Sequence, residues 1–292
     1  MDFRRKIAGP PPDFAGPPSD ITGITAGPRR KVAGPPSGSP EGRRTTAGPP
    51  PDFAERNQLI DIYIMGKSAA DDKILSYNDV VLRRSDLDIL SGPYFLNDRI
   101  IEFYFSYLSS CHVSQDILLV PPSIAFWILN CPDATYLKEF IEPLKLPEKK
   151  LVIFPVNDND DMSLAEGGSH WSLIVYERNG NVFVHHDSNH GMNKIKARKL
   201  FSAVVGFMGD STSASKAKYL DCVDSPQQTN GYDCGVYVIA IARAICCWYE
   251  SSEHKDAEGM WFSFVKEQVT STVVSQMRKE ILQLIKGLME KK

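Results

Sequence analysis

Long apolar runs are absent from this sequence of 292 residues. No uncharged stretch approaches the roughly 18 residues that a helix needs to cross a bilayer. The opening residues, Met1–Lys6, are followed by prolines and not by the apolar segment of a secretory signal. These absences argue against a membrane partner and predict a cytoplasmic or nuclear protein.

Cysteine is also scarce, with six residues and no Cys-x-x-Cys pair or other disulfide-framework spacing. Such usage is typical of a protein from a reducing compartment. One group of possible metal ligands, His185, His186, Asp187 and His190, lacks the His-Glu-x-x-His pattern or cysteine pair that would complete a site. Adjacent strand residues also point to opposite faces. We therefore expect neither a metal nor another cofactor.

Positive charge is not in excess once the N-terminal region is set aside. The whole chain has a net charge of -3, and residues 57–292 hold more Asp and Glu than Lys and Arg. Because nucleic-acid-binding surfaces are usually basic, no nucleic-acid partner is expected. The acidic balance suits a protein partner whose tail carries arginine, and it equally serves solubility.

Aliphatic residues are few in the first part of the chain. Residues 1–56 are built from Ala-Gly-Pro units, and the run Ala8–Ala15 returns almost intact as Ala47–Ala54. Proline-rich sequence with few aliphatic residues cannot bury a core and favours extended conformations. We predict a disordered tail over 1–56, a linker over 57–72 and one folded domain over 73–292.

The clearest chemical signal is a single cysteine. Cys234 lies at the end of the segment Gln227–Gly235, directly before the apolar stretch Val236–Trp248, which predicts a buried helix. A thiol at a helix N-terminus meets unpaired amides and the positive end of the helix dipole, which favour the thiolate form. Cys234 is therefore a candidate nucleophile. The alternative is a buried cysteine that serves only packing.

A cysteine nucleophile needs a histidine to take its proton and a third group to orient that histidine. His170 comes just before the apolar run Ser172–Tyr176, which predicts a strand. After Asn179-Gly180, a hairpin signal, Asn181–Asp187 predicts a returning strand. An antiparallel return brings the start of the first strand beside the end of the second. Asp187 is therefore expected beside His170.

The order of His170, Asp187 and Gln228-x5-Cys234 resembles that of the Ulp/sentrin-specific family of cysteine proteases, which cut after the C-terminal Gly-Gly of ubiquitin-like proteins. The resemblance extends from residue 73 to the C-terminus. It is strongest to the deneddylating branch, which acts on the neddylation modifier, Rub. The segments that carry it include Ile74–Tyr77, Tyr94–Asp98, Phe140–Pro147, Val156–Asn159 and Gly167–Leu173.

The resemblance implies a role for each matching residue. Cys234 would be the nucleophile, His170 the general base and then the general acid, and Asp187 the acceptor that orients the imidazole. Gln228, six residues before the cysteine, would line the oxyanion hole together with the backbone N–H of Cys234. Gln227 is the less favoured choice and is expected to hydrogen-bond within its own loop.

The resemblance also implies a slot too narrow for any residue that has a Cβ, through which a di-glycine tail passes. Trp171 matches the family's tryptophan beside the catalytic histidine, and Phe95 stands where the family has a second tryptophan. Asp98 would meet an arginine of the substrate tail, and Gly235 is also assigned to substrate binding. Phe95 has an alternative role in a helix core, and Asp98 an alternative role in the first turn of a helix capped by Asn97.

The implied fold is α+β: a papain-like, Ulp-type cysteine protease fold in which a central helix bearing the nucleophile packs on a mixed β-sheet. Residue patterns predict the individual elements. We expect helices over 123–129, 136–144, 197–208, 235–248 and from 270 onward, and strands over 150–156, 172–176 and 181–187. The C-terminal helix is expected to dock on the domain, since it has fewer than the four heptads typical of a coiled coil.

The sequence leaves three functions open. The first is a deneddylating protease, acting as a monomer on the modifier precursor or on its conjugates. The second is a protease of the same family that acts on SUMO. The third is a catalytically silent protein that binds a ubiquitin-like partner through the same slot. The presence of all four catalytic-type residues argues against the third.

Overall fold

The computed structural model describes residues 72–112, 114–131, 133–162, 164, 167–251 and 260–291. The tail expected over 1–56 lies outside the described residues, and so does the linker expected over 57–72, apart from Asp72. No helix in the described part of the chain is both long and apolar enough to cross a bilayer.

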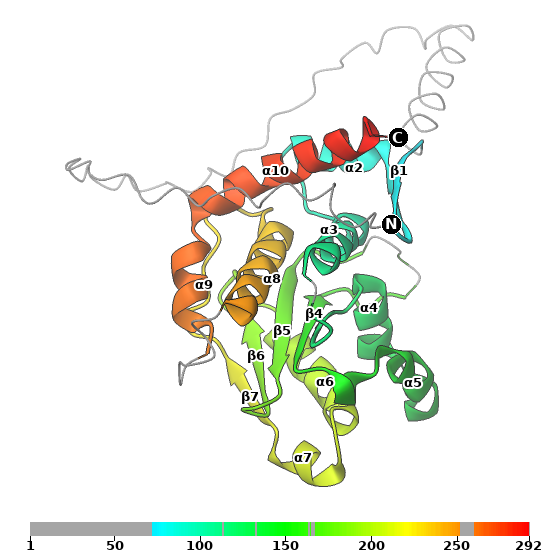
Figure 1. Cartoon of the computed structure of the whole chain (residues 1–292), viewed down its shortest axis with the longest axis vertical. Helices are drawn as coiled ribbons and strands as arrows, with labels where there is room; N and C mark the ends of the chain where they lie inside the picture. Colours follow the sequence, from blue (N-terminus) through cyan, green and yellow to red (C-terminus); the bar gives the residue numbers. More distant parts are fainter. Residues whose placement is uncertain are drawn as a thin grey trace, which may run out of the picture. The chain divides into compact units, whose positions relative to one another are not determined.

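A five-stranded sheet forms the centre of the fold, in the order β3-β4-β5-β6-β7 (Figure 1). The central strands β4, β5 and β6 are antiparallel, whereas the edge strands β3 and β7 each pair in parallel with their neighbour. The sheet is therefore mixed, as expected. Its strands are β3 Ile117–Leu119, β4 Leu151–Asn157, β5 Trp171–Glu177, β6 Val182–His186 and β7 Lys218–Asp221.

Helices cover both faces of this sheet (Figure 1). On one face α8 (Cys234–Glu250) packs on β5, and α3 (Asp98–Cys111) and α10 (Ser271–Met289) pack against α8. On the other face α4 (Pro122–Asn130) and α6 (Lys194–Val204) pack on β4. Alternate residues of β5 enter the two cores, because successive strand side chains point to opposite faces. Helix α8 therefore packs within one of the two cores, on one face of the sheet.

The remaining elements are short. A separate two-stranded sheet joins β1 to β2, which leads directly into α2. The elements are β1 Lys73–Tyr77, β2 Val80–Arg83, α2 Arg84–Ser91, α5 Ala134–Ile141, α7 Ser211–Lys216 and α9 Phe262–Gln268, with 3-10 turns η1 Glu142–Leu144, η2 Leu146–Glu148 and η3 Val205–Phe207.

The predicted helices and strands are present, with small shifts at their ends. The helix expected over 197–208 begins at Lys194 and ends as α6 at Val204, followed by the 3-10 turn η3. The helix expected from 270 onward is α10, and the side chain of Thr270 caps it by accepting from the backbone N–H of Val273. It docks on α8 and α2, as predicted.

The hairpin between β5 and β6 differs from the predicted two-residue turn. Glu177 pairs with Val182, so four residues, 178–181, form the connection. The left-handed residue is Asn181, with φ 47°, a conformation that asparagine tolerates. The carboxylate of Glu177 accepts the backbone N–H groups of Asn179 and Gly180 at 2.9 and 2.6 Å. These side-chain bonds stabilise the longer turn.

Candidate active site

Cys234 is the first residue of α8 and is 1% exposed. The helix behind it is buried on nearly every side from Cys234 to Cys246, which fixes its position against β5. Asp233 occupies the N-cap position. The thiol therefore lies at the helix N-terminus, as the sequence predicts, within the core that covers one face of the sheet.

His170 and Asp187 meet at one end of the β5–β6 pair. His170 immediately precedes β5 and Asp187 immediately follows β6, and the antiparallel register pairs Leu173 with His186. His170 Nε2 and Asp187 Oδ1 are 2.7 Å apart, and both side chains are buried. The hairpin geometry thus brings together the two residues that the sequence places side by side.

Cys234 lies close enough to the imidazole of His170 to influence its charge. Burial alone would lower the pKa of His170, but the hydrogen bonds and charges of Asp187 and Cys234 raise this pKa to about 9. Burial alone would raise the pKa of Asp187. Hydrogen bonds from His170, Asn193 and Asn189 outweigh it and lower the pKa of this carboxyl. At neutral pH the pair is therefore an imidazolium and a carboxylate.

Asn193 is a functional residue that sequence reasoning missed. Its backbone N–H donates to Asp187 Oδ2 at 2.8 Å. Its side-chain amide donates to the carbonyl oxygens of Val156 and His170, at 3.1 and 3.3 Å. One buried asparagine therefore holds the carboxylate and the backbone of the histidine together. An isolated Asn in a loop carries no local signal of such contacts.

Asp158 is a second missed residue, on the segment Val156–Asn159 that carries part of the family resemblance. Its Oδ1 accepts the backbone N–H groups of Ser169 and His170 at 2.7 and 3.0 Å. Gly168 lies beside it with φ 86°, and a Cβ there would meet Asn157 Oδ1 at 2.1 Å. Only glycine can pass this close to Asn157 at a positive φ, and this turn positions the backbone just before His170.

The two glutamines before the nucleophile differ in what they bind. Gln227 Nε2 donates to the carbonyl oxygens of Asp187 and Ser225, at 2.9 and 2.8 Å, so its amide is used inside the loop, as expected. Gln228 Nε2 donates to Asn230 O at 2.8 Å, and its Oε1 accepts from Ser188 Oγ at 2.8 Å. A carboxamide nitrogen has two hydrogens, so Gln228 keeps a second N–H for another acceptor.

Trp171 and the segment 94–96 lie against the start of α8. The indole of Trp171 donates to the carbonyl oxygen of Leu96 at 2.9 Å. A Cβ on Gly235 would meet Leu96 Cβ at 2.8 Å, so this glycine allows the segment to approach the helix. Phe95 is 48% exposed and belongs to neither core. Its side chain is therefore available at the surface next to Leu96.

Asp98 is the first residue of α3, and the side chain of Asn97 caps that helix by accepting from Ile100 N at 3.1 Å. Asp98 Oδ1 accepts the backbone N–H of Arg99 at 2.8 Å. Burial and then the charge of Asp98 raise the pKa of Glu102, one turn further on. The structure thus gives Asp98 the helix-start position that the sequence offered as its alternative role.

His185 and His186, two of the candidate metal ligands, are engaged otherwise. His185 contacts Ser172 Oγ at 3.1 Å and Asp221 Oδ1 at 3.2 Å, and His186 Nε2 accepts the indole N–H of Trp261 at 2.9 Å. Burial lowers the pKa of His186 to about 3, so this imidazole is neutral. Within the described residues, no group of three or more possible ligands is placed to hold a metal.

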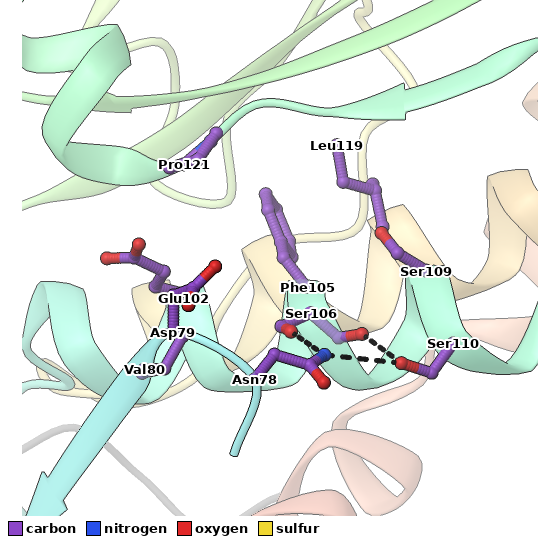
Figure 2. A pocket seen from close by; sticks show the side chains of 10 residues that line it. All are labelled: Asn78, Asp79, Val80, Glu102, Phe105, Ser106, Ser109, Ser110, Leu119 and Pro121. Atoms are coloured by element: carbon purple, nitrogen blue, oxygen red, sulfur yellow. Dashed lines mark hydrogen bonds between the residues drawn. The ribbon is translucent and has the colours of Figure 1, made fainter. Parts of the chain in front are cut away.

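A groove of about 310 Å³ lies between the turn after β1, helix α3 and the connection from β3 to α4 (Figure 2). Asn78 Nδ2 donates to Ser106 Oγ at 2.7 Å along its floor, and Glu102 and Asp79 make one end acidic. None of the predicted catalytic or substrate-binding residues lines this groove. It is separate from the site at the start of α8.

A buried thiol at the start of a central helix, close to an imidazole that a carboxylate holds, is typical of a cysteine peptidase of the papain-like class. Comparison with protein families makes this specific. The chain belongs to the Ulp1 protease family, whose C-terminal catalytic domain matches residues 94–281.

Curated relatives include NEDD8-specific protease 1 of Arabidopsis thaliana, which is 58% identical over 77% of this chain and 97% of that protein. Sentrin-specific protease 8 of Homo sapiens is 36% identical over 60% of this chain and 82% of its own length. Among solved structures, the Ulp1 protease domain in complex with SMT3 covers 84% of this chain and 99% of its own, with a TM-score of 0.54 and 19% identity. The last likeness concerns the fold alone.

Proposed function

We propose that this protein is a thiol protease that cleaves after the C-terminal Gly-Gly of the neddylation modifier, Rub or NEDD8, either to mature its precursor or to release it from conjugates. The observation that carries the proposal is the 58% identity with a NEDD8-specific protease over 97% of that protein. The predicted catalytic residues lie within the family match. The enzyme is proposed to act as a monomer, without a cofactor.

In the proposed mechanism Cys234 attacks the carbonyl carbon of the last glycine. His170 Nε2 is bound to Asp187, which leaves Nδ1 to face the thiol and to receive its proton. The raised pKa of His170 favours a proton on the imidazole, which suits its role as acceptor of the thiol proton. The imidazolium then protonates the leaving amine, and the resulting thioester is hydrolysed by water that His170 deprotonates.

Stabilisation of the tetrahedral intermediate is assigned to Gln228 and to the backbone N–H of Cys234. Two hydrogen bonds of 2.8 Å hold Gln228 to Ser188. Ser188 Oγ donates to Gln228 Oε1, and the backbone N–H of Gln228 donates to Ser188 O. A donor fixed in advance costs no reorganisation when charge develops. Replacing Gln228 with Ala is expected to lower kcat by about 10²- to 10³-fold.

Substrate binding is assigned to Trp171 and Phe95 as walls of a slot for the two glycines. Gly235 is also assigned to substrate binding, and Asp98 to an arginine of the modifier tail. The exposed ring of Phe95 and the buried, hydrogen-bonded indole of Trp171 support this arrangement. A phenyl ring covers less area than an indole. Because Phe95→Trp keeps an aromatic wall and changes only its area, we expect it to change KM by less than about threefold. Phe95→Ala removes the wall and is expected to raise KM about tenfold.

A panel of electrophilic probes tests the proposal. NEDD8, SUMO and ubiquitin, each carrying a C-terminal vinyl sulfone, are incubated with the protein, and covalent labelling of Cys234 is followed over time. The NEDD8 probe is expected to label at least tenfold faster than the others. Cys234→Ala is the matched control, which should bind NEDD8 without labelling or hydrolysis. Faster labelling by the SUMO probe would replace the proposal with the SUMO alternative.

The same control addresses the silent-binder alternative. A protein that only sequesters the modifier would bind NEDD8 equally well with or without the Cys234→Ala substitution, and neither form would release a C-terminal fluorophore. The proposed enzyme binds in both forms but hydrolyses only with the cysteine present. Hydrolysis lost in Cys234→Ala with unchanged binding therefore supports an enzyme.

We also propose a cytoplasmic or nuclear location. All six cysteines are free in the structure, which is typical of a protein from a reducing compartment. Imaging of a fluorescent fusion of the full chain tests this location, and accumulation in the secretory pathway would contradict it.

A further inference from the structure

We propose that Arg278 is a positioning residue for catalysis, which holds the nucleophile's turn and the wall of the substrate slot in register. The proposal rests on the proposed function, because it concerns the same slot. Arg278 lies in the middle of α10, a helix that contains none of the predicted site residues. It is only 8% exposed, although arginine is usually found at the surface.

One edge of the guanidinium binds Asp233, the residue directly before Cys234. Arg278 Nε and Nη2 both donate to Asp233 Oδ1, at 2.9 and 2.7 Å. The second oxygen, Oδ2, accepts from Asn230 Nδ2 at 2.7 Å. Asp233 is 5% exposed, and a carboxylate this deeply buried is stable only when it is paired and hydrogen-bonded. The ion pair therefore fixes the turn that leads into α8.

The other edge of the guanidinium binds backbone carbonyl oxygens at the end of α2 and beyond it. Nη1 donates to Ile89 O and Gly92 O at 3.0 and 3.2 Å, and Nη2 donates to Tyr94 O at 3.0 Å. Tyr232 O lies at 3.4 Å from the same nitrogen. All five N–H bonds of Arg278 are thus engaged, which a lysine with three donors and no planar fork cannot reproduce.

Tyr94 begins the segment 94–96, called here the wall segment, because it carries Phe95. Its far end is held by Trp171, whose indole donates to Leu96 O, and the side chain of Leu96 presses on Gly235 of α8. Arg278 therefore holds one end of the wall segment and, with the same guanidinium, the residue before the thiol. A displacement of about 1 Å between nucleophile and substrate can cost about a hundredfold in rate.

Arg278 also balances charge beside the nucleophile. Without the guanidinium, Asp233 would leave an uncompensated negative charge next to Cys234, which disfavours a thiolate there. Loss of Arg278 therefore has two consequences that experiments can separate. One is a less reactive thiol, which neutralising Asp233 reverses. The other is a displaced wall segment, which neutralising Asp233 leaves uncorrected.

The experiment measures two rates in Arg278→Met, in the double variant Arg278→Met with Asp233→Asn, and in Arg278→Lys. Alkylation by iodoacetamide is followed by mass spectrometry of the peptide that contains Cys234, because the other five cysteines are also free. It reports on the thiol without the slot, since this small reagent does not need the slot. Hydrolysis of NEDD8 carrying a C-terminal fluorophore, normalised to alkylatable thiol, reports on thiol and slot together. Circular dichroism and Tm identify folded variants.

We expect Arg278→Met to alkylate about tenfold more slowly and to lose about a hundredfold in kcat/KM, with a raised KM. The double variant should regain the wild-type alkylation rate within about twofold but stay at least tenfold low in kcat/KM. Arg278→Lys keeps the positive charge and takes the place of Arg278→Met in the experiment if that variant does not fold. It should alkylate normally and hydrolyse about tenfold more slowly.

Full kcat/KM in Arg278→Lys or in the double variant would overturn the proposal, because the fork to the carbonyls would then be dispensable. Wild-type alkylation in a folded Arg278→Met variant would equally overturn its electrostatic part. Failure of the proposed function has a different signature. In that case the unchanged protein would not hydrolyse the NEDD8 substrate, and the alkylation rates would still test Arg278.

Discussion

His170 and His185 are two equally buried imidazoles that approach different oxygens of the same carboxylate, yet their pKa values move in opposite directions. His170 Nε2 is 2.7 Å from Asp187 Oδ1, and its pKa is raised to about 9. His185 Nε2 is 4.0 Å from Asp187 Oδ2, and burial lowers its pKa. Both residues are 2% exposed. Burial alone therefore favours neutral imidazole, and the close hydrogen bond to Asp187 together with the influence of Cys234 reverses that preference at His170.

The other neighbours of the two imidazoles also differ, in line with the raised pKa of His170 and the lowered pKa of His185. His170 faces a thiol that can give up a proton, whereas His185 Nε2 meets the hydroxyl of Ser172. The second ring nitrogen of His185 contacts Asp221, whose charge is already shared by Lys194 and Arg198. A carboxylate that is balanced by two cations offers less to an imidazolium. These neighbours suit the proton transfer proposed for His170, whereas those of His185 suit packing.

The largest expected effect comes from replacing each histidine with glutamine. His170→Gln removes the proposed base and acid, so kcat/KM is expected to fall by about 10⁴-fold or more. His185→Gln keeps a polar side chain next to Ser172 and is expected to cost less than about tenfold. Hydrolysis of the NEDD8 fluorophore substrate measures both variants. Similar losses in the two variants would remove the distinction between the two regions.

Asp187→Asn tests the shared carboxylate. The amide cannot balance an imidazolium, so kcat is expected to fall by about 10³- to 10⁴-fold. The pKa of His170 should move down from about 9 toward its ordinary value, because two of the interactions that raise it come from Asp187. His185 should stay neutral. Titration of the imidazole resonances by NMR measures both pKa values, with His186, which contacts neither oxygen, as the internal reference.

The pH dependence of stability should show opposite signs for the two regions. Because the folded pKa of His170 is raised, its contribution is complete below pH 6.5 and is lost as pH rises through about 9, by up to about 3 kcal/mol. The pKa of His185 is lowered by folding, so below pH 6.5 this imidazole is protonated in the unfolded chain but not in the folded protein. Stability therefore falls as pH drops below 6.5.

Urea denaturation from about pH 5 to about pH 10 measures these slopes. His170→Gln is expected to flatten the alkaline limb and His185→Gln to flatten part of the acidic limb. The lowered pKa of Asp187 adds a further loss at more acidic pH, as that carboxyl becomes protonated. An alkaline limb unchanged by His170→Gln would contradict the raised pKa.

The smallest expected effect is that of Asn193→Ala, which removes side-chain hydrogen bonds to the backbone around His170. The variant loses the side-chain bonds to His170 O and Val156 O but keeps the backbone N–H that binds Asp187. We expect about a tenfold loss in kcat with little change in KM, and about 1 to 2 kcal/mol less stability. Asn193→Asp is the matched control for size. A kcat unchanged by both variants would show that the histidine needs no such support.

The sequence predicted the parts of the site that depend on local pattern. An apolar run before Asn179-Gly180 and another after it implied antiparallel strands, and such strands place His170 and Asp187 at one end. The buried helix after Cys234 followed from its composition. The assignments of catalytic and substrate-binding roles, in contrast, came from family resemblance, and they stay proposals that the variants above test.

Contacts between distant segments escaped prediction because no local pattern records them. Arg278 binds Gly92 across 186 positions, and Asn193 binds Val156 across 37. The edge strands were also missed: β7 has four residues that alternate between exposed and partly buried, too short and too polar to stand out. The exposed fraction of Phe95 likewise depends on how the segment before α3 packs, which the sequence leaves open.

The separation of Asp233 and Arg278 in the chain has a consequence for biosynthesis. Asp233 emerges from the ribosome 45 positions before the arginine that neutralises it. Until α10 has been translated and has folded back, the carboxylate of Asp233 has no Arg278 to pair with. A nascent chain halted short of Arg278 therefore has its thiol without this ion pair, and we expect the proposed proteolytic activity to arise only late in translation.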